Sequence, residues 1–222
     1  MFRLKLTLRL AAAMAIVGGI LFGSAGRIDL PFFWAYLAVL AGFSGAALLT
    51  VSRGLLEERR KPAESGRDNL ALLRITTLLV FLTQWIVAGL DVGRLHRSDT
   101  VPGVLRTVGL MSFVAVFVVW SWAMRANPFF STAVRIQRER GHHVVSSGPY
   151  RFVRHPGYAA LVLLGWGGPI ALGSWWAVVP HFILVALFAR RAALEDRMLR
   201  EELDGYSAYA AAVRYRWLPG IW

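Results

Sequence analysis

The polar side chains that could do chemistry gather in one stretch, residues 141–158, which reads GHHVVSSGPYRFVRHPGY and lies between two apolar blocks. Gly148 and Pro149 mark a turn, and the basic segment after them is too short to cross a bilayer. Pro156 suits the first position of a helix, so a long apolar helix is expected to begin directly after His155. Because a helix start offers free N–H groups and the positive end of a dipole, this site is suited to an anionic group.

A second pair of charged residues, Arg191 and Glu195, lies where the last apolar block ends. Their spacing of four places both side chains on one face of a helix. On a soluble helix such a pair contributes only a few tenths of a kcal/mol. At membrane depth, however, an ionisable group is usually paired or kept for function. The pair is therefore predicted to face the same side as the helix start at Pro156.

A metal centre is not expected. His142 and His143 are adjacent, but no acidic residue or third histidine stands near them at ligand spacing, and His155 and His181 are too remote in sequence to be expected there. The chain has no cysteine, which excludes thiolate ligands, thiolate catalysis and disulfides.

The composition indicates a polytopic membrane protein. Of the 222 residues, 56% are apolar, which is high for a soluble domain of this length. The net charge of +12 comes from basic residues in short segments between the apolar blocks. Attraction to anionic lipids and control of membrane topology explain this placement, so nucleic acid is not predicted as a partner. We expect an all-α fold in a single membrane domain, 1–222, with N-terminal spans over 1–124 and a polar half over 125–222.

Five to six transmembrane helices are expected. The first block imitates a signal peptide, but a second block follows it almost at once, so it is interpreted as a retained span. The apolar stretch after Pro156 is too long for one span and short for two. It contains Gly167-Gly168-Pro169 and Gly173-Ser174, which predicts a helical hairpin whose second arm is tilted or kinked at Pro180. The blocks are about 6–26, 31–51, 69–90, 103–124 and 156–189.

The distribution of Lys and Arg predicts the orientation. These residues concentrate in four segments, 3–9, 53–67, 125–154 and 190–216, whereas the opposite side holds only Arg27, Arg94, Arg97 and Arg106. With six spans, the excess places both termini in the cytoplasm. The stretch 141–158 and the charged tail then face the same compartment. The tail is expected to be an amphipathic helix that ends near Gly205, followed by another helical turn.

The motifs together resemble the isoprenylcysteine carboxyl methyltransferase family. The resemblance covers about 127–218 and consists of VVSSGPYRFVRHPGY, an apolar hairpin, RAALEDxxL, YxxY and a terminal RxLP. The segment LLEERRKP also resembles bacterial members. The resemblance implies a bacterial inner-membrane enzyme that uses S-adenosyl-L-methionine without the soluble Rossmann fold, with a cytoplasmic cofactor-binding loop and a C-terminal helix. The sequence has no glycine-rich strand-turn-helix unit, in agreement.

Residue roles follow from the resemblance. Arg191 matches the residue that meets the acceptor's carboxylate, and Arg154 is placed with it as catalytic. The family's paired acidic residues after Arg191 appear here as Glu195-Asp196, which departs from the family's pattern. The positions that match cofactor-binding residues are Gln137, His142, His143, Val144, Val145, Tyr150, His155, Pro156, Gly157, Tyr158 and Glu195.

The reaction that the resemblance implies is carboxyl O-methylation of an isoprenylcysteine-like, lipophilic substrate that enters from the bilayer. Alternatives are N-methylation of a phospholipid amine, NADPH-dependent reduction by a membrane reductase with a related C-terminal half, and a non-enzymatic helical scaffold. Arg191 is poorly suited to approach a cationic amine, and no basic cluster is dedicated to a 2′-phosphate. The scaffold is disfavoured because every polar position of the pattern is filled. The oligomeric state is left open.

Overall fold

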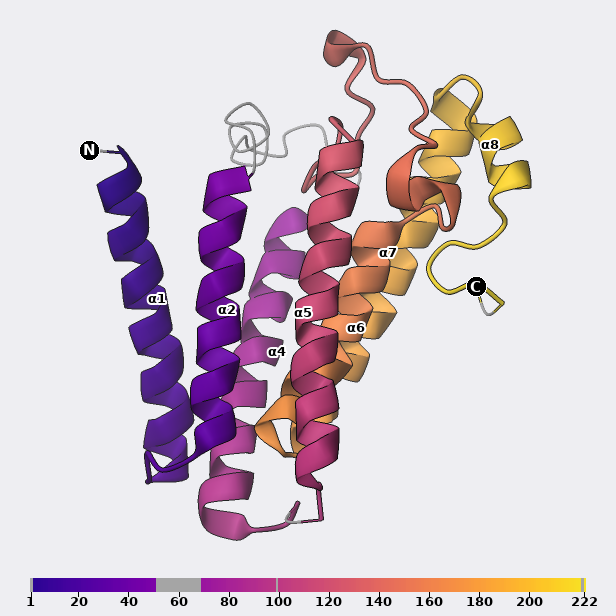
Figure 1. Ribbon diagram of the computed structural model, residues 1–222. Coiled ribbons are helices and arrows are strands. Elements are labelled where there is room, and N and C mark those ends of the chain that lie inside the picture. The colour runs from indigo at the N-terminus through magenta and orange to yellow at the C-terminus, as the bar shows by residue number, and fades with distance from the viewer. Residues whose placement is uncertain (1, 51–68, 99, 221) are drawn as a thin grey trace. The chain divides into compact units, whose positions relative to one another are not determined.

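The computed structural model describes residues 2–50, 69–98, 100–220 and 222 (Figure 1). Segment 55–62, which carries LLEERRKP, lies outside these residues. The described part of the chain contains helices and no strand. The helices are α1 (Phe2–Ala25), α2 (Pro31–Thr50), α4 (Leu70–Leu90), α5 (Gly103–Ala126), α6 (Pro156–Leu172), α7 (His181–Glu202) and α8 (Tyr206–Ala212). The described residues also form a π-helical turn, Asp91–Leu95, and 3-10 turns at Arg138–Arg140, Gly148–Arg151 and Trp176–Val178.

Within the described residues, four stretches are long and apolar enough to cross a membrane, judged by length and composition. They are Thr7–Ala25, Leu70–Leu95, Gly103–Ala126 and Trp176–Glu202. Pro31–Ala46 and Pro156–Leu172 are shorter apolar helices. An all-α polytopic architecture is thus consistent with the structure, while the expected number of spans and their orientation stay predictions.

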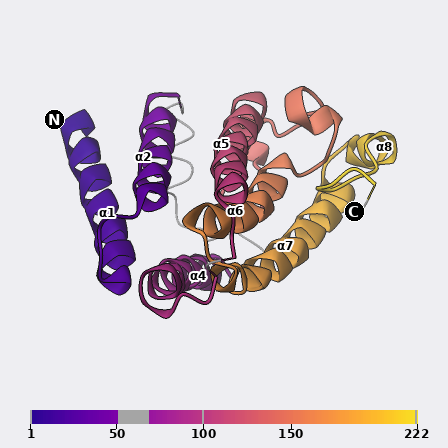
Figure 2. The ribbon, with the colours of Figure 1, turned by 60° about the horizontal axis from the view of Figure 1, so that its bottom comes forward.

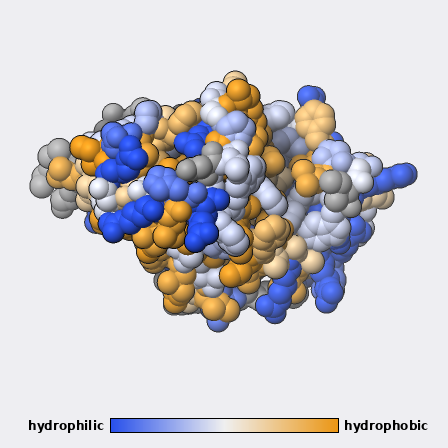
Figure 3. Space-filling view, turned by 90° about the horizontal axis from the view of Figure 1, so that it is seen from below, coloured by the Kyte–Doolittle hydropathy of each residue, from blue (hydrophilic) through white to orange (hydrophobic). Residues whose placement is uncertain are grey.

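Many apolar side chains on these helices face outward. Leu78 and Leu79 on α4 are 57% and 55% exposed, and Met111 on α5 is 68% exposed. Apolar residues also reach the surface among hydrophilic ones on the face drawn in Figure 3. Such exposure is unfavourable in water and favourable against lipid chains, which agrees with a membrane protein.

The chain folds into two compact units, and each is described by itself. The described residues of unit 1 lie within 2–50, 76–117 and 163–184, and those of unit 2 within 69–75, 118–162 and 185–222. Helices α4 to α7 each contribute to both units. The expectation of a single membrane domain with a boundary after residue 124 stays a prediction.

In unit 1, α1 and α2 lie side by side (Figures 1 and 2). The core there includes Phe33 and Tyr36, and the Tyr36 ring stacks on Phe113 with centroids 5.0 Å apart. Glycine allows close approach of α4 to α1, since a Cβ on Gly89 would lie 2.6 Å from the carbonyl oxygen of Leu21. Unit 1 is therefore held by close helix packing, as is usual among membrane helices.

Asp91 follows α4 directly and is the first residue of the π-helical turn. Its carboxylate is buried and accepts hydrogen bonds from Ser98 Oγ and Ser174 Oγ, each at 2.5 Å, and from the backbone N–H of Arg97 at 3.0 Å. Arg94 donates instead to the carbonyl oxygen of Gly23. Asp91 thus joins the π-helical turn to the turn that follows α6.

The predicted hairpin is present, and its turn lies at the second of the two predicted breaks, Gly173-Ser174. Helix α6 continues through Pro169 to Leu172 and stops at Gly173, whose φ of +87° suits glycine. Helix α7 begins at His181, so Pro180 precedes this helix and does not kink it, contrary to expectation. A proline before the first turn removes no helical hydrogen bond, which explains this position. The Trp166 and Phe182 rings of the two arms lie 5.3 Å apart.

The charged tail folds as the sequence predicted. Helix α7 carries the apolar block directly into the charged segment and ends at Glu202. Gly205 has a φ of +81°, and α8 follows from Tyr206. Tyr206 and Tyr209 pack with Tyr150 in the core of unit 2.

Candidate active site

Helix α6 begins at Pro156, as predicted, and its start is bound to the C-terminal segment. The backbone N–H of Arg154 donates to the carbonyl oxygen of Tyr215, and that of His155 donates to the carbonyl oxygen of Arg216, both at 2.9 Å. The side chains of Arg154 and His155 are buried. The chain after α8 therefore fixes the backbone just ahead of α6.

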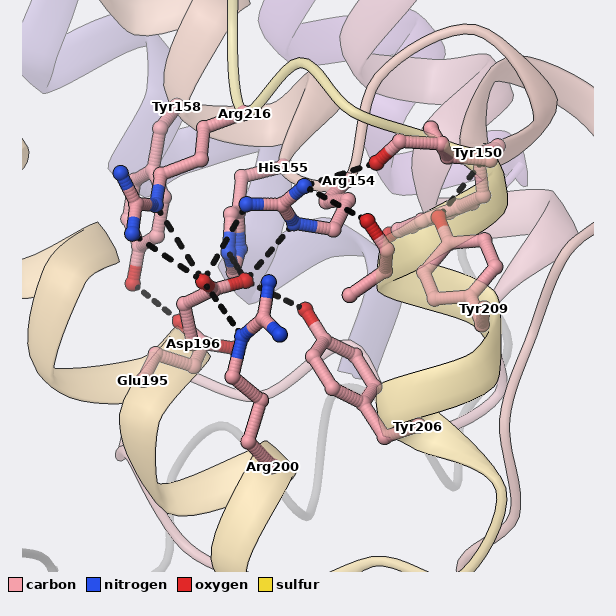
Figure 4. Close-up of polar contacts among 12 residues, drawn as sticks. Tyr150, Arg154, His155, Tyr158, Glu195, Asp196, Arg200, Tyr206, Tyr209 and Arg216 are labelled. Carbon is pink, nitrogen blue, oxygen red and sulfur yellow. Dashed lines mark hydrogen bonds and ion pairs between the residues drawn. The ribbon is translucent and has the colours of Figure 1, made fainter. Parts of the chain in front are cut away.

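Asp196 on α7 is the centre of a buried charged cluster (Figure 4). Its side chain is 1% exposed. Arg154 binds it through both carboxylate oxygens, with Nε 2.8 Å from Oδ1 and Nη2 3.2 Å from Oδ2. The hydroxyl of Tyr206 donates to Oδ1 at 2.9 Å, and Arg200 Nε and Arg216 Nε each lie 3.3 Å from Oδ2. These partners compensate the desolvation of the carboxylate and join the segment before α6 to α7, α8 and the C-terminal segment.

The third nitrogen of Arg154 binds backbone. Nη1 donates to the carbonyl oxygens of Val213 and Arg214, both at 2.7 Å. Every nitrogen of this guanidinium therefore has a partner within the protein. These contacts hold the segment that follows α8 against the start of α6. No contact of Arg154 with the described residues supports its predicted catalytic role, which stays a prediction.

Tyr158, in the first turn of α6, connects the charged pair on α7. Figure 4 shows its contact with Glu195. Arg191 Nε donates to the hydroxyl of Tyr158 at 2.7 Å, and this hydroxyl lies 2.7 Å from Oε2 of Glu195, to which it donates. Arg191 Nη2 also donates to the carbonyl oxygen of Thr132. The guanidinium and the carboxylate, expected on one face from their spacing, are thus brought together by a single hydroxyl.

The loop after α5 contains several predicted cofactor residues. The Gln137 side chain is 1% exposed and is used within the loop, since Nε2 donates to the carbonyl oxygen of Phe129 at 2.7 Å and Oε1 accepts from Arg140. The ring of His142 lies 4.4 Å from that of Phe129, and its Nδ1 accepts the backbone N–H of Gln137 at 3.2 Å. His143 is exposed and meets the edge of the same phenyl ring.

The remaining predicted residues line the core of unit 2 or lie at the start of α6. Val144 and Val145 pack, partly buried, against the core. Tyr150 is buried, its hydroxyl accepts from Asn127, and its carbonyl oxygen accepts from Tyr209 at 2.7 Å. Pro156 and Gly157 are buried at the first turn of α6, where a Cβ on Gly157 would lie 2.7 Å from the ring of Phe130. His155 Nε2 lies 3.5 Å from Oδ1 of Asp196.

The charge of Glu195 reaches the loop residues. Burial lowers the pKa of His142, and the carboxylate of Glu195 partly offsets that effect. Burial raises the pKa of Tyr150, the hydrogen bond with Asn127 opposes the rise, and Glu195 adds to it. His142 and Tyr150 therefore share the electrostatic environment of the Tyr158–Glu195 contact, although they come from different segments.

The sequence does not predict the partners of Asp196, which it shows only as the second residue of an acidic pair. Tyr206 and Arg216 belong to the YxxY and RxLP motifs, for which the sequence predicts no contact. One signal was available. Arg154 and Asp196 are opposite charges next to apolar blocks, where unpaired charges are costly, so each needed a partner.

Similarity to known proteins is found over the part of the chain that includes Tyr158, Arg191 and Glu195. Residues 107–201 match the "Isoprenylcysteine carboxyl methyltransferase (ICMT) family". Two proteins named "Probable protein-S-isoprenylcysteine O-methyltransferase", from Oryza sativa subsp. indica and Oryza sativa subsp. japonica, are each 29% identical to this chain over 109 residues. The aligned part is 48% of this chain and 57% of each rice protein, so the chain spans little more than half the length of these relatives. Over residues 107–201, this chain is therefore similar to the isoprenylcysteine carboxyl methyltransferase family.

Proposed function

We propose that this protein is an integral membrane methyltransferase that uses S-adenosyl-L-methionine to methylate the carboxylate of an isoprenylcysteine-like acceptor. The observation that carries the proposal is the hydrogen-bonded series Arg191, Tyr158, Glu195 inside the family region. It offers a guanidinium for an anionic acceptor and a carboxylate for a cationic group, one helical turn apart.

The residues around Glu195 suit the cofactor. The half-buried carboxylate of Glu195 can accept hydrogen bonds from an ammonium group, and charge-assisted bonds of this kind are strong. The adjacent, tilted rings of His142 and Phe129, with Val144 and Val145 beside the core, suit a flat group with apolar faces. When bound, S-adenosyl-L-methionine supplies a methyl group activated on a sulfonium.

The chain's own task is to orient the acceptor. A carboxylate is already a nucleophile at neutral pH, so no general base is needed, and alignment with exclusion of water accounts for the catalysis. Arg191 orients the carboxylate with a planar guanidinium that its two contacts hold in place. Arg154 acts as a positioning residue, because its nitrogens hold the α6 start to Asp196 and to the exit of α8.

The membrane supplies the acceptor in this proposal. A prenylated or similarly lipophilic substrate enters from the bilayer, and membrane lipids surround the apolar helices. The enzyme lies in the bacterial inner membrane with both termini in the cytoplasm, where the cofactor is available.

The test is binding and transfer by detergent-solubilised protein. Calorimetric titration is expected to detect S-adenosyl-L-methionine and no NADPH. Transfer is expected to the free carboxylate of a farnesylated cysteine analogue and not to its methyl ester. Arg191→Lys keeps the charge but loses the planar fork, so turnover should fall by up to about 100-fold while cofactor affinity changes little.

A neighbouring exposed arginine provides the matched control. Arg190→Lys should keep wild-type turnover. Wild-type transfer by Arg191→Lys would refute the role of this residue. Transfer only to amine-bearing lipids would instead assign the protein to N-methylation, and binding of NADPH alone would assign it to the reductases.

A further inference from the structure

We infer that the hydroxyl of Tyr158 couples the cofactor site to the acceptor site, so that the two ligands bind cooperatively. The inference rests on the proposed function and adds a positioning residue that acts between the two binding groups. It concerns Arg191, Tyr158 and Glu195, all within unit 2.

The directions of the two hydrogen bonds are the first argument. A guanidinium can only donate, so Tyr158 Oη accepts from Arg191 Nε at 2.7 Å. The single proton of the hydroxyl is then left for Oε2 of Glu195, also at 2.7 Å. One orientation of the hydroxyl satisfies both bonds. Turning this hydroxyl away would break its bond to the carboxylate and weaken the bond from the guanidinium.

The surroundings of Tyr158 are the second argument, because they fix the ring that carries the hydroxyl. The ring stacks on Phe188 with centroids 5.7 Å apart and lies 5.7 Å from the ring of His155. The guanidinium carbon of Arg191 lies 5.9 Å from its centroid. A hydroxyl on a ring held in this way can transmit the position of one partner to the other.

Cooperative binding follows from shared ordering. A cationic group bound at Glu195 orders the carboxylate, which orders the hydroxyl and, through it, the guanidinium. The acceptor's carboxylate then meets an ordered Arg191 and loses less conformational entropy on binding. By linkage, the acceptor must tighten the cofactor by the same factor. If the hydroxyl only held α6 to α7, its removal would weaken either ligand without changing this factor.

The test measures binding without turnover. The affinity of S-adenosylhomocysteine, which has no methyl group to transfer, is measured with and without a saturating farnesylated cysteine analogue that has a free carboxylate. In the wild type we expect the analogue to tighten binding by about 5-fold or more, the lower end of typical allosteric couplings. Tyr158→Phe should reduce that factor to less than about 2-fold. Tyr215→Phe removes a hydroxyl from an exposed ring and should keep the wild-type factor.

A second pair of variants tests the same coupling with Tyr158 in place. Glu195→Gln keeps an oxygen that can accept from the hydroxyl, so the coupling factor should persist even though affinity falls. Glu195→Ala removes the acceptor and should abolish the factor. These variants decide the matter if Tyr158→Phe does not fold.

The outcomes separate the two claims. No binding of S-adenosylhomocysteine to the wild type would refute the proposed function. Binding without coupling in the wild type would overturn this inference alone. Coupling that survives in folded Tyr158→Phe, or in Glu195→Ala, would overturn it as well.

Discussion

Replacing Asp196 by asparagine removes the negative charge from the buried cluster and keeps the shape of the side chain. The carboxylate is 1% exposed and receives both Nε and Nη2 of Arg154, itself a buried side chain. In the variant, an amide N–H₂ group would face arginine donors, and the guanidinium would stay buried without its counter-charge.

The expected loss of stability is about 3–5 kcal/mol, the range for removing one partner of a buried ion pair. Most of it comes from Arg154. The side chains of Arg200 and Arg216 are 41% and 29% exposed, so water screens their share. The opening should begin where the cluster holds the chain, at the start of α6 and the segment after α8.

Hydrogen exchange of the protein in detergent measures this opening. The backbone amides of Arg154 and His155, which donate to the C-terminal segment, should lose protection first. Cofactor affinity should fall with them. Asp204→Asn, an exposed carboxylate between α7 and α8, should change stability by less than about 0.5 kcal/mol. Combining Asp196→Asn with Arg154→Met should restore part of the loss, because the unpaired buried charge is then gone.

A small effect would refute the reasoning. If Asp196→Asn cost less than about 1 kcal/mol, with protection of both amides unchanged, the cluster would not be what holds the tail to α6. The positioning role assigned to Arg154 would then lose its basis.

Three further predictions concern the site and the topology. Gly157→Ala would place a Cβ 2.7 Å from the ring of Phe130, so the ring must shift, at an overpacking cost of about 1–3 kcal/mol. Titration should therefore show weaker cofactor binding. Unchanged affinity would show that the loop carrying Phe130 moves without cost. Burial lowers the pKa of His142, so opening of its loop takes up a proton. The contribution of neutral His142 to loop stability is therefore present above the unfolded pKa of about 6.5 and is lost as pH falls through the folded pKa. The amide of Gln137, bonded to that ring, should therefore lose protection in acid, and His142→Gln should remove this pH dependence. A reporter active only in the periplasm and fused after Trp222 should stay inactive, whereas strong activity would contradict the cytoplasmic orientation.

Much of the local structure could be predicted because helices depend on contacts near in sequence. The helix start at Pro156, the tail helix ending near Gly205 and the apolar blocks follow from proline, glycine and hydropathy, whose effects are local. The placement of Arg191 and Glu195 on one face follows from the helical period alone. The motifs that resemble the methyltransferase family are likewise legible in the printed sequence.

The partners of these residues could not be predicted, since they come from far along the chain. Arg154 and Asp196 are 42 residues apart, Tyr158 reaches Arg191 across 33 residues, and Ser174 reaches Asp91 across 83. No periodicity links such positions. By itself, the sequence determined the helices, the apolar surface and the residue types of the site. Only the tertiary structure decided that Arg154 binds Asp196 and that Tyr158 joins Arg191 to Glu195, because hydrogen bonds and ion pairs depend on distances that packing sets.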